Sequence, residues 1–204
     1  MRKTRIAVLV SGGGTNLQAL LEAERAGNIP HGEIVLVLAN NPRAYALERA
    51  KNFGVTGAVV TKKGCGGSQE AFEEAVQRVL EENDIQLIIL AGFMSILSEK
   101  FTSRWPNRII DIHPSLIPAF CGEGFYGLRV HEAALARGVK LTGATVHFVN
   151  EIPDGGPIIL QKAVAVQEGD TPETLQRRVM EQAEWLLLPQ AAELVSRKIT
   201  EERG

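Results

Sequence analysis

The chain has 204 residues, of which 45% are hydrophobic, so it can bury a full core and its length demands no second domain. Its 22 basic and 24 acidic residues give a formal net charge of −2, which argues against a nucleic-acid-binding surface. We therefore expect a single domain over residues 1–204 that holds any anionic ligand by local contacts.

Short apolar runs alternate with amphipathic stretches in the first half of the chain. Runs this continuous are typical of strands buried on both faces, and helices between them permit parallel crossovers. The pattern predicts strands at residues 5–10, 33–40, 57–62 and 86–92, separated by helices at residues 15–27, 43–53 and 69–82.

The second half begins with a short helical segment and a strand at residues 108–113. The pattern then predicts a glycine-rich loop at 121–128, a helix at 130–137, strands at 142–150 and 157–166, and a helical segment at 171–197 that Pro189 interrupts. Taken together, these elements predict an α/β fold with a doubly wound, mostly parallel sheet flanked by helices.

The sequence SGGGTN, residues 11–16, follows the first strand and opens a helix. Its backbone N–H groups and the helix N-terminus make a natural phosphate site. A dinucleotide fingerprint would need a third glycine where Leu17 stands, and no Gly-Lys-Ser/Thr follows as a triphosphate loop requires. The SGGGTN loop therefore favours a monophosphate. The alternative is a plain turn in which Thr15 caps the helix and Gln18 completes a capping box.

The strand at residues 108–113 ends with a carboxyl group and an imidazole two residues apart. Asp111 and His113 share a face, because side chains alternate along a strand. Ligands of open α/β sheets bind at the carboxyl ends of strands, which makes His113 the candidate catalytic histidine. Among the other histidines, His147 lies within a strand pattern, and we interpret it as a packed or surface strand residue.

A third motif, NEIPDGGPI at residues 150–158, places an acid before two glycines and a proline. Such a turn exposes the carboxylate of Asp154, and a plain turn is the simpler interpretation of this motif alone.

Cysteine content and hydropathy indicate the compartment. Two cysteines are too few for a disulfide framework and lack the spacing of a zinc site, which favours a reducing environment. The apolar run at residues 6–10 is shorter than a signal-peptide core, and the run at 87–97 is too short to span a membrane. We expect a cytoplasmic protein with no metal, no membrane partner and no nucleic-acid partner.

Together, the three motifs resemble those of the phosphoribosylglycinamide formyltransferases. These enzymes transfer the formyl group of 10-formyltetrahydrofolate to the amine of glycinamide ribonucleotide in purine biosynthesis. The resemblance runs from RIAVLVSGGGTNLQAL through LAGFMSILS and IHPSLIPAF to TGATVHFVNEIPDGGPIILQ. It implies a Rossmann-like formyltransferase fold, a folate-dependent transferase, and formyl folate as the cosubstrate.

The resemblance also implies roles for individual residues. It makes His113 and Asp154 catalytic and puts Asp111 where the family has an asparagine that binds the transferred oxygen. It assigns the nucleotide substrate to Gly14, Thr15, Asn16 and Glu184. It assigns the folate to Gln69, Met94, Ser95, Ile96, Leu97, Asp111, Asn150, Glu151, Ile152, Pro153 and Asp154.

The mechanism implied suits these residue types. Attack of an amine on a formyl carbonyl makes an oxyanion, which needs a donor and a proton relay. We expect Asp154 to raise the pKa of His113 and hold it charged, and Asp111 to be ionised and paired with His113. The chain departs from relatives at Gln69 and Ser95, where arginines are common, and in a longer loop at 121–128.

Three alternatives stay open. A formyltetrahydrofolate hydrolase passes the formyl group to water, and such relatives usually carry an N-terminal regulatory domain. A methionyl-tRNA formyltransferase needs a second domain for the tRNA, whereas the first already uses most of this chain. A ligand-binding relative could have lost catalysis through Asp111. The sequence also leaves open whether the chain forms a homodimer.

Overall fold

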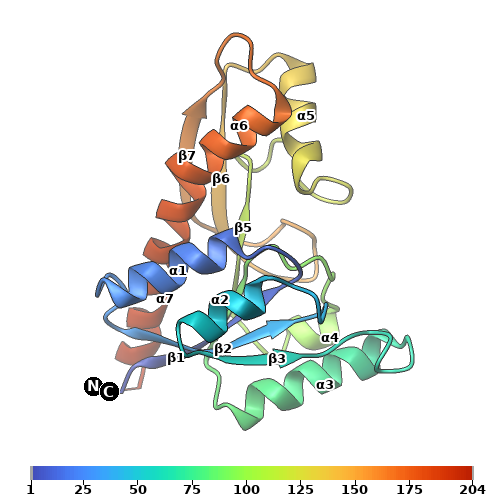
Figure 1. Cartoon of the computed structure of the whole chain (residues 1–204), viewed down its shortest axis with the longest axis vertical. Coiled ribbons are helices and arrows are strands. Elements are labelled where there is room, and N and C mark those ends of the chain that lie inside the picture. The colour runs from blue at the N-terminus through green and yellow to red at the C-terminus, as the bar shows by residue number, and fades with distance from the viewer. Residues whose placement is uncertain (1, 204) are drawn as a thin grey trace.

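Seven strands form one sheet in the order β3-β2-β1-β4-β5-β6-β7 (Figure 1). The structure, a computed structural model, describes residues 2–203. Neighbouring strands from β3 to β5 are parallel, whereas β6 runs antiparallel to both β5 and β7. The predicted doubly wound, mostly parallel fold is confirmed. The strands are β1 (Thr4–Val10), β2 (Gly32–Ala39), β3 (Thr56–Val59), β4 (Leu87–Leu90), β5 (Ile109–His113), β6 (Leu141–Phe148) and β7 (Ile158–Ala165).

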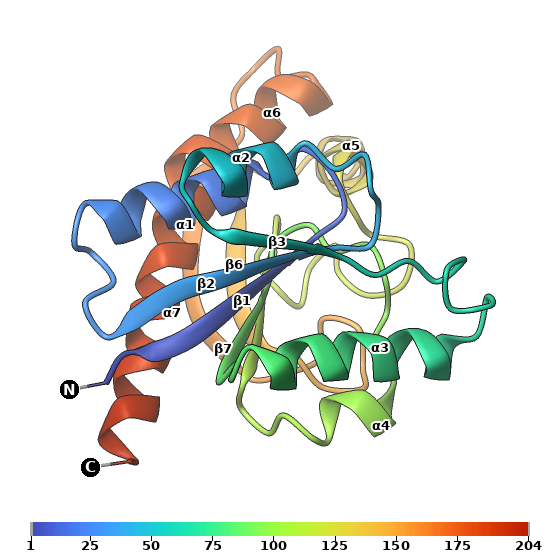
Figure 2. The ribbon, with the colours of Figure 1, turned by 60° about the horizontal axis from the view of Figure 1, so that its bottom comes forward.

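Helices cover the two faces of the sheet unequally (Figure 2). One hydrophobic core joins the sheet to α1, α2, α6 and α7, and a second, smaller core joins its other face to α3 and α4. Among residues 2–203, no helix has the length and apolar character needed to cross a membrane. The helices are α1 (Thr15–Arg25), α2 (Ala46–Asn52), α3 (Gln69–Glu82), α4 (Glu99–Thr102), α5 (Leu128–Arg137), α6 (Pro172–Val179), the π-helical turn η1 (Met180–Glu184) and α7 (Trp185–Glu201).

The apolar strands supply both cores at once. In β1, Ile6, Val8 and Val10 face the larger core, while Ala7 and Leu9 face the smaller one. This alternation explains why the strand sequences are apolar at nearly every position.

The smaller core ends at Ile109 of β5. The next positions on that side of the sheet are polar: Asp111 and His113 on β5, and Thr145 and His147 on β6. The uneven cover of the sheet therefore leaves one face of β5 and β6 for chemistry.

The C-terminal helical segment changes its winding upstream of the predicted position. Pro189 lies inside α7, and the irregular turn is η1, which ends at Glu184. Proline lacks an N–H, and its ring crowds the carbonyl group four residues earlier. For Pro189 that carbonyl belongs to Trp185, the first residue of α7, directly after η1. The helix adapts to the proline by wider winding, so the predicted break at Pro189 is wrong.

Candidate active site

A pocket of about 720 Å³ lies at the carboxyl ends of the parallel strands. Its walls include Asn16 just after β1, Leu90 at the end of β4 and His113 at the end of β5. Strands β1 and β4 are neighbours in the sheet, but the chain leaves them towards opposite faces. Open α/β sheets bind their ligands at such a point, where the strand order reverses. The predicted site residues in this lining are Asn16, Met94, Ser95, Ile96, Leu97, Asp111, His113, Asn150, Glu151, Ile152, Pro153, Asp154 and Glu184. Gly14, Thr15 and Gln69 lie outside it.

The SGGGTN loop leads into α1 without a side-chain cap. Gly14 is the N-cap residue, with φ of +71°, and no side chain in the described chain accepts from the first N–H groups of α1. The alternative, a capping box of Thr15 and Gln18, is not formed, because Gly14 is the N-cap residue and the Gln18 amide donates to Glu22 over 2.7 Å. A Cβ on Gly14 would lie 2.7 Å from the Cβ of Ala46, so α2 packs directly against the loop. Uncapped N–H groups at a helix start suit an anion.

Glu184 and Asn16 form a buried polar pair on the pocket wall. The Asn16 amide donates to Glu184 Oε2 over 2.8 Å. Burial raises the pKa of Glu184 to about 7, against the opposing effect of the Asn16 hydrogen bond. Asn16 Oδ1 is buried and finds no hydrogen-bond partner among residues 2–203. An unsatisfied amide oxygen beside a buried carboxyl suits the hydroxyl groups of a ligand.

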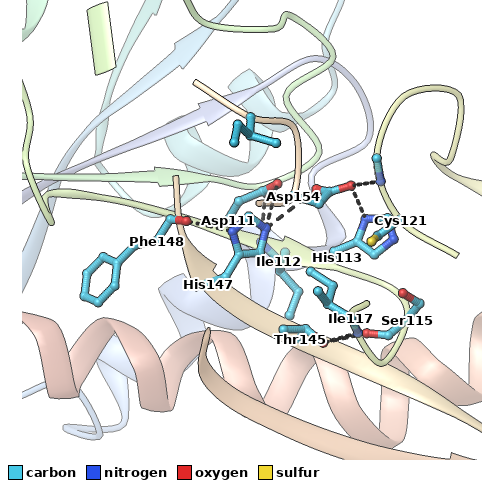
Figure 3. Close-up of polar contacts among 12 residues, drawn as sticks. Asp111, Ile112, His113, Ser115, Ile117, Cys121, Thr145, His147, Phe148 and Asp154 are labelled. Atoms are coloured by element: carbon cyan, nitrogen blue, oxygen red, sulfur yellow. Dashed lines mark hydrogen bonds and ion pairs between the residues drawn. The ribbon is translucent and has the colours of Figure 1, made fainter. Parts of the chain in front are cut away.

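His113 lies between Asp154 and the glycine-rich loop (Figure 3). Its Nδ1 is 3.4 Å from Asp154 Oδ2, which also accepts a 2.7 Å hydrogen bond from the backbone N–H of Gly122. Its Nε2 donates to the carbonyl oxygen of Phe120 over 2.8 Å. The fold thus brings together a histidine and an aspartate that are 41 positions apart in the sequence.

The turn after β6 determines where the Asp154 carboxylate lies. Asp154 has φ of +55°, a left-handed conformation that aspartate tolerates better than most residues. A Cβ on Gly155 would lie 2.6 Å from Ile152 Cγ2, and one on Gly156 would lie 1.7 Å from the carbonyl oxygen of Phe148. The two glycines therefore permit the tight turn that brings the carboxylate to His113.

Asp111 faces a different imidazole from the one expected. It is paired across β5 and β6 with His147, and its Oδ2 lies 3.9 Å from His147 Nε2. Within residues 2–203, His147 is the only histidine at ion-pair distance from Asp111, so the expected Asp111–His113 pair is not formed.

His147 is the site residue that the sequence interpretation missed. It is buried as expected of a packed strand residue, but it lines the pocket, and its Nε2 lies 3.6 Å from Asp154 Oδ1. The signal for it is the antiparallel register of β5 and β6, which the sequence alone does not specify.

Burial dominates the electrostatics of these groups. It lowers the pKa of His113 more than Asp154 raises it, so the expected net rise in the pKa of His113 is wrong. Burial also raises the pKa of Asp111 to about 7, although His147 opposes this. For Asp154 burial is again the largest single effect, but the two histidines and the Gly122 N–H together keep its pKa below the usual value.

The opposite wall of the pocket is apolar. Met94, Ile96 and Ile152, the apolar rim, are 57%, 66% and 58% exposed and lie together in the lining of one pocket, as apolar side chains at a ligand-binding surface do. Ser95 is held by the Asn40 amide over 2.9 Å, and Gln69 donates to the carbonyl oxygen of Ile96 over 3.0 Å. Gln69 thus supports the apolar rim from outside the pocket.

Asp111, His147 and Asp154, the acceptor cluster, each offer one atom within 4.8 Å of the others. His147 Nε2 lies 3.6 Å from Asp154 Oδ1 and 3.9 Å from Asp111 Oδ2. Two ligand atoms of a tetrahedral zinc site lie roughly 3.4 Å apart, so both distances are longer than a zinc ion requires. We assign no metal to these residues.

Comparisons with known proteins agree with this arrangement. The formyl transferase family matches residues 4–191. The chain is 46% identical over 194 residues to the trifunctional purine biosynthetic protein adenosine-3 of Gallus gallus, covering 95% of this chain and 18% of that protein. It therefore spans less than a fifth of the length of that relative. It is 41% identical over 178 residues to the phosphoribosylglycinamide formyltransferase of Haemophilus influenzae, covering 87% of this chain and 81% of that one.

A solved structure extends the likeness to the fold. The glycinamide ribonucleotide transformylase 1 of Symbiobacterium toebii superposes with a TM-score of 0.89 at 42% identity, covering 96% of this chain and 89% of that one. The match spans the sheet and the segments that form the pocket. The chain belongs to the formyl transferase family.

Proposed function

We propose that this chain is a phosphoribosylglycinamide formyltransferase, which transfers the formyl group of 10-formyltetrahydrofolate to the amine of glycinamide ribonucleotide in purine biosynthesis. The observation that carries the proposal is one pocket in which Asn16, beside an uncapped helix start, meets the apolar rim and the His113–Asp154 pair. Relatives named for this activity at 41% and 42% identity support it. We propose that residues 1–204 form one formyltransferase domain.

The nucleotide substrate fits the wall formed by the SGGGTN loop and η1. The phosphate would accept from the free N–H groups at Gly14, Thr15 and Asn16. Asn16 Oδ1 and Glu184 would then take the ribose hydroxyls, which satisfies the buried amide oxygen that the protein leaves without a partner. The amine of the substrate would point along the pocket towards His113.

The folate fits the opposite wall. A pteridine is a flat heteroaromatic ring, and such rings bind in apolar pockets that offer a few polar groups. Residues 94–97 and 150–154 provide this combination, with the apolar rim on one side and backbone groups of the Asp154 turn on the other. The carbonyl to be attacked would lie near His113 and Asp111.

The chemistry follows from the proton balance of amine attack. The attacking amine loses a proton as the tetrahedral oxyanion forms, and a nearby base must take it. The lowered pKa of His113 favours the neutral imidazole, which can take this proton, and the ionised Asp154 stabilises the imidazolium once the proton has moved. His113 then gives the proton to the folate nitrogen as the intermediate collapses and the bond between that nitrogen and the formyl carbon breaks, which releases tetrahydrofolate. His113 is therefore the general acid/base, and Asp154 its charged partner.

One incubation tests the proposal. The purified protein is mixed with 10-formyltetrahydrofolate, with and without glycinamide ribonucleotide, and the folate product and formate are followed. Formyl transfer that depends on the amine supports the transferase. Formate release without the amine would support the hydrolase, and the absence of both products would support a binding protein. The cytoplasmic location and a homodimer stay predictions.

A further inference from the structure

Three hydrogen-bond acceptors converge on the pocket floor (Figure 3). His147 Nε2 lies 3.9 Å from Asp111 Oδ2 and 3.6 Å from Asp154 Oδ1. The His147 side chain is 2% exposed, and its Nε2 has no hydrogen-bond partner in the part of the chain that the structure describes. Buried acceptors that face one another repel, so the acceptor cluster requires a proton or a cation between its members.

The other nitrogen of the ring shows which tautomer His147 adopts. His147 Nδ1 lies 2.8 Å from the carbonyl oxygen of Phe148, which can only accept, so Nδ1 carries a hydrogen. A neutral His147 would then turn the lone pair of Nε2 towards two carboxyl groups. An imidazolium instead turns a second N–H towards them, which converts repulsion into attraction.

The remaining carboxylate oxygens already have partners. Asp111 Oδ1 accepts from the N–H of Ile112 over 2.9 Å, and Asp154 Oδ2 accepts from the N–H of Gly122 over 2.7 Å. Each carboxylate therefore has one oxygen held by the backbone and turns the other towards His147. The arrangement leaves His147 as the shared partner of both.

We propose that His147 is a positioning residue, an imidazolium whose Nε2–H is shared by Asp111 and Asp154. In this role it offsets the charge that Asp111 brings to the pocket floor and holds Asp154 in line with His113. The catalytic consequence rests on the proposed function, whereas the charge state of His147 does not.

The groups around His147 favour this distribution of charge. The titratable groups that face the cluster are Asp111 and His113 on β5, Asp154 in the turn and Glu184 on η1, while β7 contributes the apolar Ile158 opposite His147. Burial is the largest single effect and lowers the pKa of His147, but Asp154, Asp111 and the Phe148 carbonyl together outweigh it and leave that pKa above its usual value. Burial moves His113, Glu184 and Asp111 towards their neutral forms, whereas the pKa shifts of His147 and Asp154 favour their charged forms, so His147 is the cation of the group.

NMR titration of histidine tests the charge state without any substrate. The chain has four histidines, so uniformly labelled imidazoles give few signals, which single His→Gln variants assign. We expect His147 to keep both ring protons above pH 7. Asp111→Asn and Asp154→Asn should each lower its titration midpoint by about one pH unit, because each removes a facing charge.

A control variant shows whether the shift in the His147 midpoint requires a carboxyl in the pocket or follows from removing any carboxyl. Glu193→Gln removes a carboxyl that lies 2.6 Å from His31, remote from the pocket, and should leave the His147 midpoint in place. A His147 that is neutral at pH 7, or whose midpoint is the same in Asp111→Asn, would overturn the proposal. A wild-type titration that changes on adding EDTA would also overturn it, in favour of a bound metal ion.

A kinetic cycle tests the catalytic consequence. His147→Gln keeps an amide donor near Nε2 but removes the charge, so one carboxyl of the cluster must bind the missing proton. The variant should lose kcat about tenfold with little change in the KM for glycinamide ribonucleotide, and its activity should fall as pH rises past neutral. In the Asp111→Asn background the same change should cost much less and the new pH dependence should disappear, because one carboxyl is gone.

The outcomes distinguish the two proposals. Equal losses from His147→Gln in both backgrounds, with an unchanged pH profile, would reduce His147 to a packing residue and refute the positioning role. A wild-type chain that transfers no formyl group would refute the proposed function, and the NMR titration would still decide the charge state.

Discussion

Replacing Gly14 by alanine should destabilise the protein, and the structure gives the size of the effect. At φ of +71° a side chain costs about 1–2 kcal/mol. The new Cβ would lie 2.7 Å from Ala46 Cβ and 3.0 Å from Ala46 Cα, and since backbone cannot yield as a flexible side chain does, this overpacking adds about 1–3 kcal/mol. Alanine also reduces the conformational entropy of the unfolded chain, which stabilises the folded state by about 0.4–1 kcal/mol. The net loss is therefore about 3 kcal/mol.

The assay is thermal unfolding by calorimetry. For a chain of this length, about 3 kcal/mol lowers Tm by about 6–12 °C. Gly13→Ala is the matched control, because its Cβ would meet nothing within 4 Å and its φ lies outside the left-handed region. We expect that control to keep the wild-type Tm or exceed it slightly. A Gly14→Ala protein as stable as the Gly13→Ala protein would refute the steric argument.

Three further predictions concern the pocket. His113→Ala should abolish turnover while calorimetric titration still shows glycinamide ribonucleotide binding, since the SGGGTN loop is a separate segment; lost nucleotide binding would contradict this. Asp154→Asn should slow the reaction and move the acidic limb of the pH–rate profile by about one unit to lower pH, because removing the carboxylate lowers the pKa of His113; an unmoved limb would count against the pair. Folding raises the pKa of Glu184 from 4.5 to about 7, so the folded state binds this proton more tightly than the unfolded state. The free energy of unfolding should therefore fall by up to about 3 kcal/mol as pH rises from 4.5 to 7. Glu184→Gln should remove that fall in denaturant titrations, and an unchanged slope would show that the carboxyl is more solvated than its burial indicates.

Elements with complete local signals could be predicted from the sequence. Helix α3 has the predicted bounds, Gln69–Glu82, because Ser68 caps it by accepting from the N–H of Ala71 and its apolar residues recur at helical spacing. The strands could be predicted because burial on both faces requires unbroken apolar runs. The face shared by Asp111 and His113 followed from strand alternation alone.

Features that depend on tertiary pairing could not be predicted. The neighbour of Asp111 is decided by the register in which β6 joins β5, and that register brings in His147 from 36 positions away. The pKa of His113 is decided by burial, which depends on the chain around it and not on Asp154 alone. Asp154 itself looked like an ordinary turn residue, and only the family resemblance assigned it a role.

The smaller core ends at Ile109, so positions on that face of β5 fall under two different requirements, apolar packing up to Ile109 and contact with the pocket beyond it. Residues before that point are selected for apolar volume, and a change there is felt by the whole domain. Asp111 and His113, the next positions on that face, line the pocket, so a carboxyl in place of an amide alters charge there without opening a void. A change of charge at Asp111 therefore acts first on its neighbour His147 and leaves the volume of the apolar core unchanged.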